Sequence, residues 1–272
     1  MTTSMHSLQA MALGAVQGVT EFLPVSSSGH LILARHYFNM PEVPLLFDVY
    51  LHVATLIVVC FFYRATIGLM LKAFVHLIGK KMDDIDKIYL RYFIIIVAST
   101  VMTIIVALVL RLFTSEQPSV VFVAIMMLIT ATFLLYRPKK GKRLDKDYKD
   151  LGPINAIITG IAQGFGTLPG ISRSGITITS GLVSGMKREV AGEFAFILSI
   201  PAILGALVLT SIDYSVGSQT ISFAAVAAGS ITAAITGFFS LKMLLWIVKK
   251  ARLWLFSIYL VIVSLTILIT SL

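Results

Sequence analysis

The segment Pro24-Val25-Ser26-Ser27-Ser28-Gly29-His30 decides the fold that we predict, because a related segment, Pro169-Gly170-Ile171-Ser172-Arg173-Ser174-Gly175, follows about half a chain later. Matching residues lie 146 positions apart: Gln17 and Gln163, Ser26 and Ser172, Ser28 and Ser174, and Gly29 and Gly175. We interpret this repeat as an internal duplication in which two halves of the chain build one site. The halves differ in charge, since the first carries Glu21 and His30 and the second carries Arg173.

The composition is that of an integral membrane protein. Hydrophobic residues make up 57% of the chain and charged residues only 13%, whereas about a quarter of a soluble domain is charged. The formal net charge of +9 comes from basic residues in short loops between apolar segments. This distribution is typical of the positive-inside rule and argues against nucleic-acid binding. The N-terminus lacks a basic region followed by a cleavable apolar core, so we expect no removable signal peptide.

Six apolar segments approach the length of about 20 residues that a helix needs to cross a bilayer. We predict transmembrane helices at 47–63, 92–112, 119–136, 190–210, 221–247 and 253–271. Residues 65–79 predict an interfacial helix. Two further apolar segments, 8–33 and 153–183, are interrupted by glycine and proline. Broken backbone at membrane depth persists only where protein or a wet cavity surrounds it, so these segments predict two re-entrant helical hairpins.

The charge of the loops predicts their sides of the membrane. Loops 64–91, 137–150 and 249–252 are basic and should be cytoplasmic. Loops 113–118 and 211–219, together with both termini, should then lie outside. With these sides, the first hairpin enters from outside and the second from the cytoplasm.

We therefore predict an all-α, polytopic membrane protein of one domain, residues 1–272. Six transmembrane helices and two re-entrant helical hairpins form an inverted-topology repeat, approximately 1–136 and 151–272, joined by the basic loop 137–150. Both hairpin tips should meet near the middle of the membrane. We expect Gly14, Gly18, Gly160 and Gly164 to permit close helix packing.

The hairpin tips have the chemistry of an anion site. Glycine- and serine-rich loops that open a helix present backbone N–H groups and the positive end of the helix dipole. Arg173 adds a planar guanidinium that matches phosphate oxygens. The expected phosphate-binding residues are Gln17, Ser26, Ser28, Gly29, Gly170, Ser172, Ser174, Gly175 and Thr177.

Ser27 and His30 lie three residues apart, so a helix that begins near the tip places them on one face. A serine beside a histidine can act as an activated nucleophile. Glu21 could orient His30, act as an acid or base, or hold a divalent cation. The alternative for Glu21 is a plain ion pair with Arg173. Three further ionisable residues could belong to the site or simply mark the start of a span: Asp48, His52 and Glu193.

At these residues the chain resembles the undecaprenyl-diphosphate phosphatase family, the bacitracin-resistance type of integral membrane phosphatase. Its motifs appear here as Gln17-Gly18-Val19-Thr20-Glu21, as residues 24–30, and as Pro169 through Thr177. Many members have Glu where this chain has Gln17, which removes one carboxylate from a metal site built on paired acids.

The resemblance implies hydrolysis of a C55 polyprenyl diphosphate to the monophosphate and inorganic phosphate. It implies recycling of the cell-wall lipid carrier, bacitracin resistance, and dependence on a divalent cation such as Mg²⁺ or Ca²⁺. It also implies a bacterial plasma-membrane protein whose active site opens to the outer face. We further expect membrane lipid as a partner and no nucleic acid, and a homodimer is compatible with the resemblance. The alternative is a transporter or flippase of an anionic polyprenyl phosphate lipid, because inverted repeats with broken helices are also typical of transporters.

Overall fold

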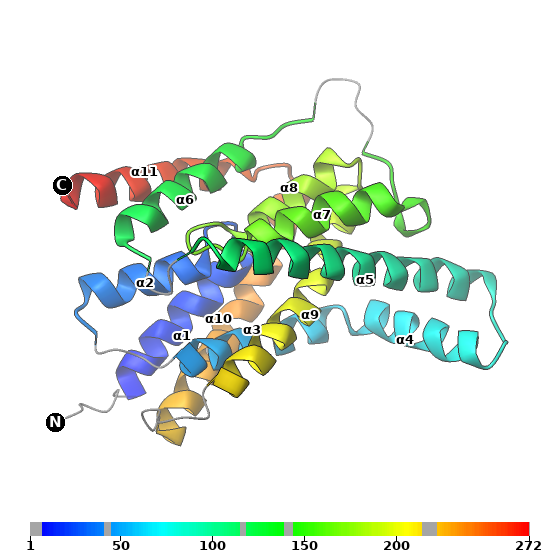
Figure 1. The fold of residues 1–272 in the computed structure, drawn as a ribbon, viewed down its shortest axis with the longest axis horizontal. Coiled ribbons are helices and arrows are strands. Elements are labelled where there is room, and N and C mark those ends of the chain that lie inside the picture. Colours follow the sequence, from blue (N-terminus) through cyan, green and yellow to red (C-terminus); the bar gives the residue numbers. More distant parts are fainter. Residues whose placement is uncertain (1–6, 41–44, 115–117, 139–143, 214–221, 272) are drawn as a thin grey trace.

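The computed structural model describes residues 7–40, 45–114, 118–138, 144–213 and 222–271. The regular elements in these ranges are helices (Figure 1). They are α1 (Ser7–Phe22), α2 (Ser27–Tyr37), α3 (Leu45–Phe62), α4 (Arg64–Ile78), α5 (Asp84–Arg111), α6 (Val120–Leu134), a 3-10 helix at Tyr148–Asp150, α7 (Pro153–Phe165), α8 (Arg173–Val183), α9 (Arg188–Asp213), α10 (Phe223–Lys249) and α11 (Trp254–Thr270). The prediction of an all-α chain is confirmed for the described residues.

Helix length and composition indicate a polytopic membrane protein. Helices α5, α9 and α10 are long and apolar enough to cross a membrane, and the pair α3–α4, bent by 78°, counts as a fourth span if it is taken as one. Helices α6 and α11 are apolar but have only 15 and 17 residues. The six-span arrangement therefore stays a prediction. The expected helix at 65–79 is present as α4, beside α5 (Figure 1).

Both predicted hairpins are broken helices. The chain leaves the helical conformation between α1 and α2 and again between α7 and α8. Each second half-helix begins at a serine cap, because Ser26 Oγ accepts the N–H of Gly29 at 3.3 Å and Ser172 Oγ accepts the N–H of Gly175 at 3.1 Å. Ser26 has a φ of 72°, which is strained for a residue with a Cβ and is typical of functional sites.

The four matched glycines permit close packing, as predicted. A Cβ at Gly14 would lie 2.2 Å from the carbonyl oxygen of Gly229 on α10, and one at Gly160 would lie 2.5 Å from that of Ser99 on α5. Their partners one turn later, Gly18 and Gly164, meet the same two long helices. The first half-helix of each hairpin is therefore wedged against a long helix from the other half of the chain.

The two hairpin tips touch each other. The N–H of Gly170 donates to Ser26 Oγ at 3.1 Å, and Ser174 Oγ donates to the carbonyl of Leu23 at 3.4 Å. Gly170 has a φ of +95°, and a Cβ there would lie 2.5 Å from the carbonyl oxygen of Val123 on α6. A residue other than glycine would be excluded by both conformation and space. Buried side chains of α3, α6, α9 and α10 pack around the tips, so the site sits inside the helical bundle.

Parts of three predicted loops lie outside the residues that the structure describes. This applies to residues 115–117 of the first outside loop, 139–143 of the basic loop and 214–219 of the second outside loop, and to both chain ends.

Candidate active site

Glu21 is the centre of the site. It lies in the last turn of α1 and is 9% exposed. Its Oε1 pairs with the guanidinium of Arg173, the first residue of α8. Its Oε2 accepts hydrogen bonds from Ser27 Oγ at 2.5 Å and from Gln17 Nε2 at 3.0 Å. Residues that lie up to 156 positions apart in the chain thus meet at one carboxylate, and the ion pair with Arg173 is the one that the sequence left open as the alternative for Glu21.

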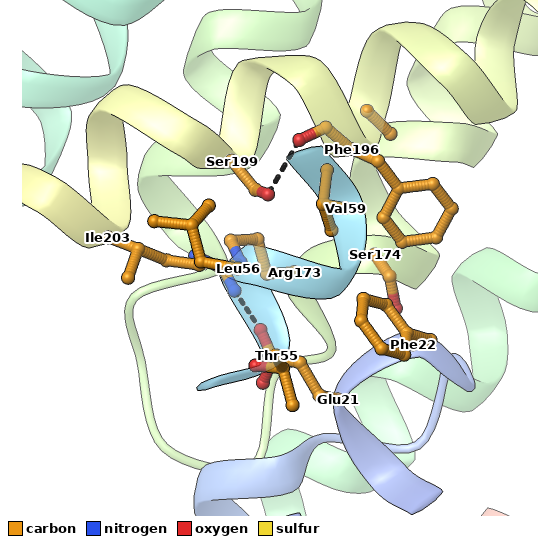
Figure 2. Close-up of a pocket in the computed structure, with 11 residues that line it drawn as sticks. Glu21, Phe22, Thr55, Leu56, Val59, Arg173, Ser174, Phe196, Ser199 and Ile203 are labelled. Carbon is orange, nitrogen blue, oxygen red and sulfur yellow. Dashed lines mark hydrogen bonds and ion pairs between the residues drawn. The ribbon is translucent and has the colours of Figure 1, made fainter. Parts of the chain in front are cut away.

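The Glu21–Arg173 pair is shielded from water on one side. Figure 2 shows the guanidinium of Arg173 against the carboxylate of Glu21, with the apolar side chains of Phe22, Leu56 and Ile203 around them. The space left between these groups is about 10 Å³, too little for more than a single water. A closely packed apolar lining of this kind strengthens the attraction between the two charges.

The other side of the pair opens into a cavity of about 230 Å³. Its polar wall consists of Thr20, Glu21, Ser26, Ser27, Ser28, His52, Gln163, Thr167, Ser172 and Arg173. Its apolar wall consists of Val49, Ile171, Ala202, Ile203 and Ala206, from α3, α9 and the second tip. The cavity therefore combines hydroxyl and cationic groups with an apolar surface.

The predicted contact between Ser27 and His30 is wrong. His30 Nδ1 lies 2.8 Å from the carbonyl oxygen of Ser26, and its Nε2 lies 2.7 Å from the hydroxyl of Tyr259 on α11. Since a carbonyl only accepts, Nδ1 carries a proton, and in the neutral ring Nε2 then accepts from Tyr259. Both ring nitrogens are occupied, and Ser27 points instead to Glu21. The three-residue spacing was correct for a regular helix, but it could not reveal the partner that α11 supplies.

Gln17 is placed differently from the prediction. It does not line the cavity but is fully buried behind Glu21, where its Nε2 also lies 2.8 Å from His52 Nδ1. An amide at this position donates to Glu21, whereas a second carboxylate would repel it. Gln17 therefore orients Glu21 and does not reach the space where a ligand would bind.

The predicted glycine donors serve the tips and not the cavity. The N–H groups of Gly29, Gly170 and Gly175 are all taken by the hydroxyls of Ser26 and Ser172. In α2 the first intrahelical hydrogen bond is donated by the N–H of His30, and in α8 by that of Ile176. The N–H groups of the first two residues of each helix therefore make no intrahelical bond; these residues are Ser27 and Ser28 on α2 and Arg173 and Ser174 on α8.

Thr177 and Ser174 do not line the cavity either. Thr177 is buried, and its hydroxyl has no hydrogen-bond partner among the described residues. Ser174 donates to the first tip and lies 3.2 Å from Ser172 Oγ. Ser172 itself lines the cavity, and its N–H donates to Thr130 Oγ1 at 3.0 Å. Of these hydroxyl groups, that of Ser174 links the second tip to the first.

Sequence reasoning left open one residue that the structure brings into the site. His52, on α3, lies 3.2 Å from Glu21 Oε2. An ionisable residue inside an apolar segment was the available signal. By contrast, Asp48 pairs with Arg35, and Glu193 lies near Tyr148. Neither of these acids lines the cavity. Tyr259 and Thr130 carried no signal in the sequence, because hydroxyl residues are common in membrane helices.

A metal ion would find few ligands in the protein alone. The described residues contain no cluster of three or more His, Cys, Asp or Glu side chains. Of the residues that the structure describes, Glu21 is the only carboxylate that lines the cavity, and both of its oxygens already accept hydrogen bonds. This donor set fits an ion such as Mg²⁺, which is commonly held by one or two carboxylates together with water and substrate phosphates.

Comparison with known proteins agrees with the motifs. Residues 10–266 match the family described as bacitracin resistance protein BacA. The chain belongs to the BacA family. It is 39% identical over 257 residues to a protein of Treponema denticola named undecaprenyl-diphosphatase, with 94% of each chain covered. Proteins of the same name from Alkaliphilus metalliredigens and Methanobrevibacter smithii are 39% and 38% identical, and the alignments cover 94% and 98% of this chain and 95% and 98% of theirs. The similarity to these BacA relatives thus extends over nearly the full length of both chains.

Proposed function

We propose that this chain hydrolyses undecaprenyl diphosphate to undecaprenyl phosphate and inorganic phosphate, and so recycles the lipid carrier of cell-wall synthesis. The relatives named undecaprenyl-diphosphatase match nearly the whole chain. The observation that carries the proposal is the 2.5 Å contact between Ser27 Oγ and Glu21 Oε2, in a cavity that also contains Arg173. A serine beside a carboxylate has a use in hydrolysis but none in transport.

The substrate would bind with its diphosphate between the two tips. Arg173 and the free N–H groups at the starts of α2 and α8 would hold the phosphate oxygens. The first isoprene units would lie against the apolar wall, which includes Ala202, Ile203 and Ala206. These two parts of one cavity suit a ligand that is charged at one end and hydrocarbon at the other.

In the first chemical step, Ser27 Oγ attacks the terminal phosphorus and Glu21 Oε2 takes the serine proton. The bond from this phosphorus to the bridging oxygen breaks, and undecaprenyl phosphate leaves with the electron pair. The contact already present between the two groups supports Glu21, rather than His30, as the base. Arg173 would transfer from Glu21 to the equatorial oxygens as negative charge builds up on them.

In the second step, water attacks the phosphoserine. The bond between phosphorus and Ser27 Oγ breaks, Glu21 returns its proton to the serine oxygen, and one proton of the water passes to solvent. The competing mechanism has no covalent step, since Glu21 then activates water directly and Ser27 only binds phosphate. Detection of labelled Ser27 after rapid quench, with substrate labelled at the terminal phosphate, separates the two mechanisms.

His30 would act as a positioning residue. Its bonds to the Ser26 carbonyl and the Tyr259 hydroxyl hold the strained first tip. His30→Ala should therefore slow turnover less completely than Ser27→Ala, which should abolish it while leaving substrate binding largely intact.

We also propose that a divalent cation, Mg²⁺ or Ca²⁺, binds together with the substrate, with Glu21 as its protein ligand. When bound, it would neutralise charge on the phosphate oxygens. A chelator should then lower turnover, and excess Mg²⁺ should restore it. Full activity in the presence of the chelator would show that Arg173 and the helix N-termini are sufficient.

The inverted-topology repeat remains part of the proposal. Contacts that recur at a spacing of 146 support it: the two serine caps, the two pairs of packing glycines, and the amide bonds from Gln17 to α3 and from Gln163 to α9. With the basic loops in the cytoplasm, the cavity would open to the outer face of the plasma membrane. A homodimer stays a prediction.

Phosphate release from undecaprenyl or farnesyl diphosphate by the detergent-purified protein tests the function. No gradient exists in detergent, so a transporter would release nothing. We expect steady release by the wild type and none by Ser27→Ala. Absence of release by the folded wild type would favour the transporter.

A further inference from the structure

A second cavity, of about 510 Å³, lies where α6, α8, α10 and α11 approach one another at their ends. It shares no lining residue with the catalytic cavity. Helix α8 connects the two, since Arg173 at its start lines the catalytic cavity and Leu182 lines the second. Nine residues of helix separate these positions by roughly 13 Å. The volume of the second cavity is within the range of about 300–1,000 Å³ that is usual for ligand sites.

The rim of the second cavity is strongly basic. Four cations line it: Arg137, Arg188, Lys250 and Arg252. Among the described residues, no acidic side chain lines this cavity and none of the four cations forms an ion pair with a carboxylate. Four cations gathered without a counter-ion repel one another, so an anion in the cavity would relieve this repulsion.

The floor of the cavity is apolar. It is built by Leu134, Leu182, Val248 and Leu253, each less than 10% exposed. The indole of Trp254, at the start of α11, lies under the guanidinium of Arg137, 5.5 Å from ring centroid to Cζ. Tryptophan and arginine at the ends of membrane helices mark the level of the lipid headgroups. The cavity thus combines a buried apolar floor with a cationic rim.

The turn that presents two of the cations is held rigidly. Between α10 and α11, the N–H of Ala251 donates to the carbonyl of Val248 and that of Arg252 donates to the carbonyl of Ile247. Ala251 has a φ of +55° where glycine is usual. The backbone that carries Lys250 and Arg252 is therefore ordered before an anion binds, which lowers the backbone entropy lost on binding.

We propose that this cavity binds the phosphate headgroup of an anionic phospholipid, separately from the catalytic site. Its charge selects a phosphate without a compensating cation, and its apolar floor selects a phosphate that carries a glycerol and acyl chains over a free anion. Basic pockets between membrane helices are typical sites for such headgroups. Under the topology proposed above, the lipid belongs to the cytoplasmic leaflet, although binding itself does not depend on that assignment.

The test measures binding of the first phosphatidylglycerol molecule to the purified full chain by native mass spectrometry, with phosphatidylcholine for comparison. Each cation near an anionic headgroup contributes roughly fivefold in affinity, so the double variant Arg188→Gln/Arg252→Gln should bind phosphatidylglycerol about 25-fold more weakly. Lys249→Gln is the matched control, because Lys249 is exposed and adjacent in sequence but does not line the cavity. It should bind as the wild type does.

Phosphate release by the same variants serves as the folding check, since neither arginine lies in the catalytic cavity. If the double variant Arg188→Gln/Arg252→Gln kept both turnover and phosphatidylglycerol affinity, the proposal would be wrong. Equal affinity of the wild type for phosphatidylcholine would also overturn it. If soluble glycerol phosphate displaced the lipid at equal concentration, the cavity would be a free-phosphate site and the assignment to a lipid would be wrong. If the double variant failed to fold, Arg137→Gln/Lys250→Gln should give a similar loss.

Discussion

Glu21→Gln gives the sharpest test of the site, because it keeps the shape of the side chain and removes its negative charge. In the structure Ser27 Oγ lies 2.5 Å from Glu21 Oε2, the length of a hydrogen bond from a hydroxyl to a charged oxygen. An amide cannot take the serine proton, and it leaves Arg173 without its counter-ion. Loss of a general base costs about 10²–10⁴-fold in turnover, or about 3–5 kcal/mol in the activation barrier.

The assay is phosphate release in detergent by four proteins: the wild type, Glu21→Gln, Ser27→Ala and the double variant. Residues that act as a unit are not additive, so the double variant should be no slower than the slower single variant. Asp48→Asn is the control, because it removes a carboxylate that pairs with an arginine outside the cavity, and it should keep most of the turnover. If Glu21→Gln kept more than a tenth of wild-type turnover, Glu21 would not be the base for Ser27.

Three further predictions concern the second tip, the helix packing and the membrane topology. Arg173→Lys should lose about 10²-fold in turnover although the charge is kept, because an ammonium cannot replace a bidentate guanidinium on phosphate; near-normal kinetics would make Arg173 a structural counter-ion. Gly14→Ala should lower the detergent unfolding temperature through an overpacking cost of about 1–3 kcal/mol, whereas Gly68→Ala, with open space around it, should not; equal effects would contradict the close packing of α1 on α10. Single cysteines at positions 145 and 215, in a chain without its natural cysteine, should react with an impermeant reagent in intact cells only at 215; labelling at 145 would contradict the proposed topology.

The caps and the close helix packing of the two tips could be predicted from the sequence, because each copy of the duplicated motif is a short continuous segment. Ser26, Ser172 and the matched glycines recur at a fixed spacing, and the caps and close packing that they make are local consequences of a serine at a helix start or a missing Cβ. The composition likewise required apolar helices, since few charged residues were present to cover a soluble surface. These features need only the residue types and their order along the chain.

The partners of the ionisable groups depended on tertiary structure. The three-residue spacing of Ser27 and His30 suggests that they pair. Instead, the Tyr259 hydroxyl on α11 hydrogen bonds with His30 Nε2, and Glu21 accepts the hydrogen bond of the Ser27 hydroxyl. His52 enters the site because α3 passes beside α1. Helix periodicity shows which side chains share a face of one helix, but it does not show which other helix packs against that face. The sequence by itself therefore determined the membrane class, the broken hairpins and the serine and glycine motifs of the two tips. The packing of distant helices decided which ionisable groups contact one another and which of them line the cavity.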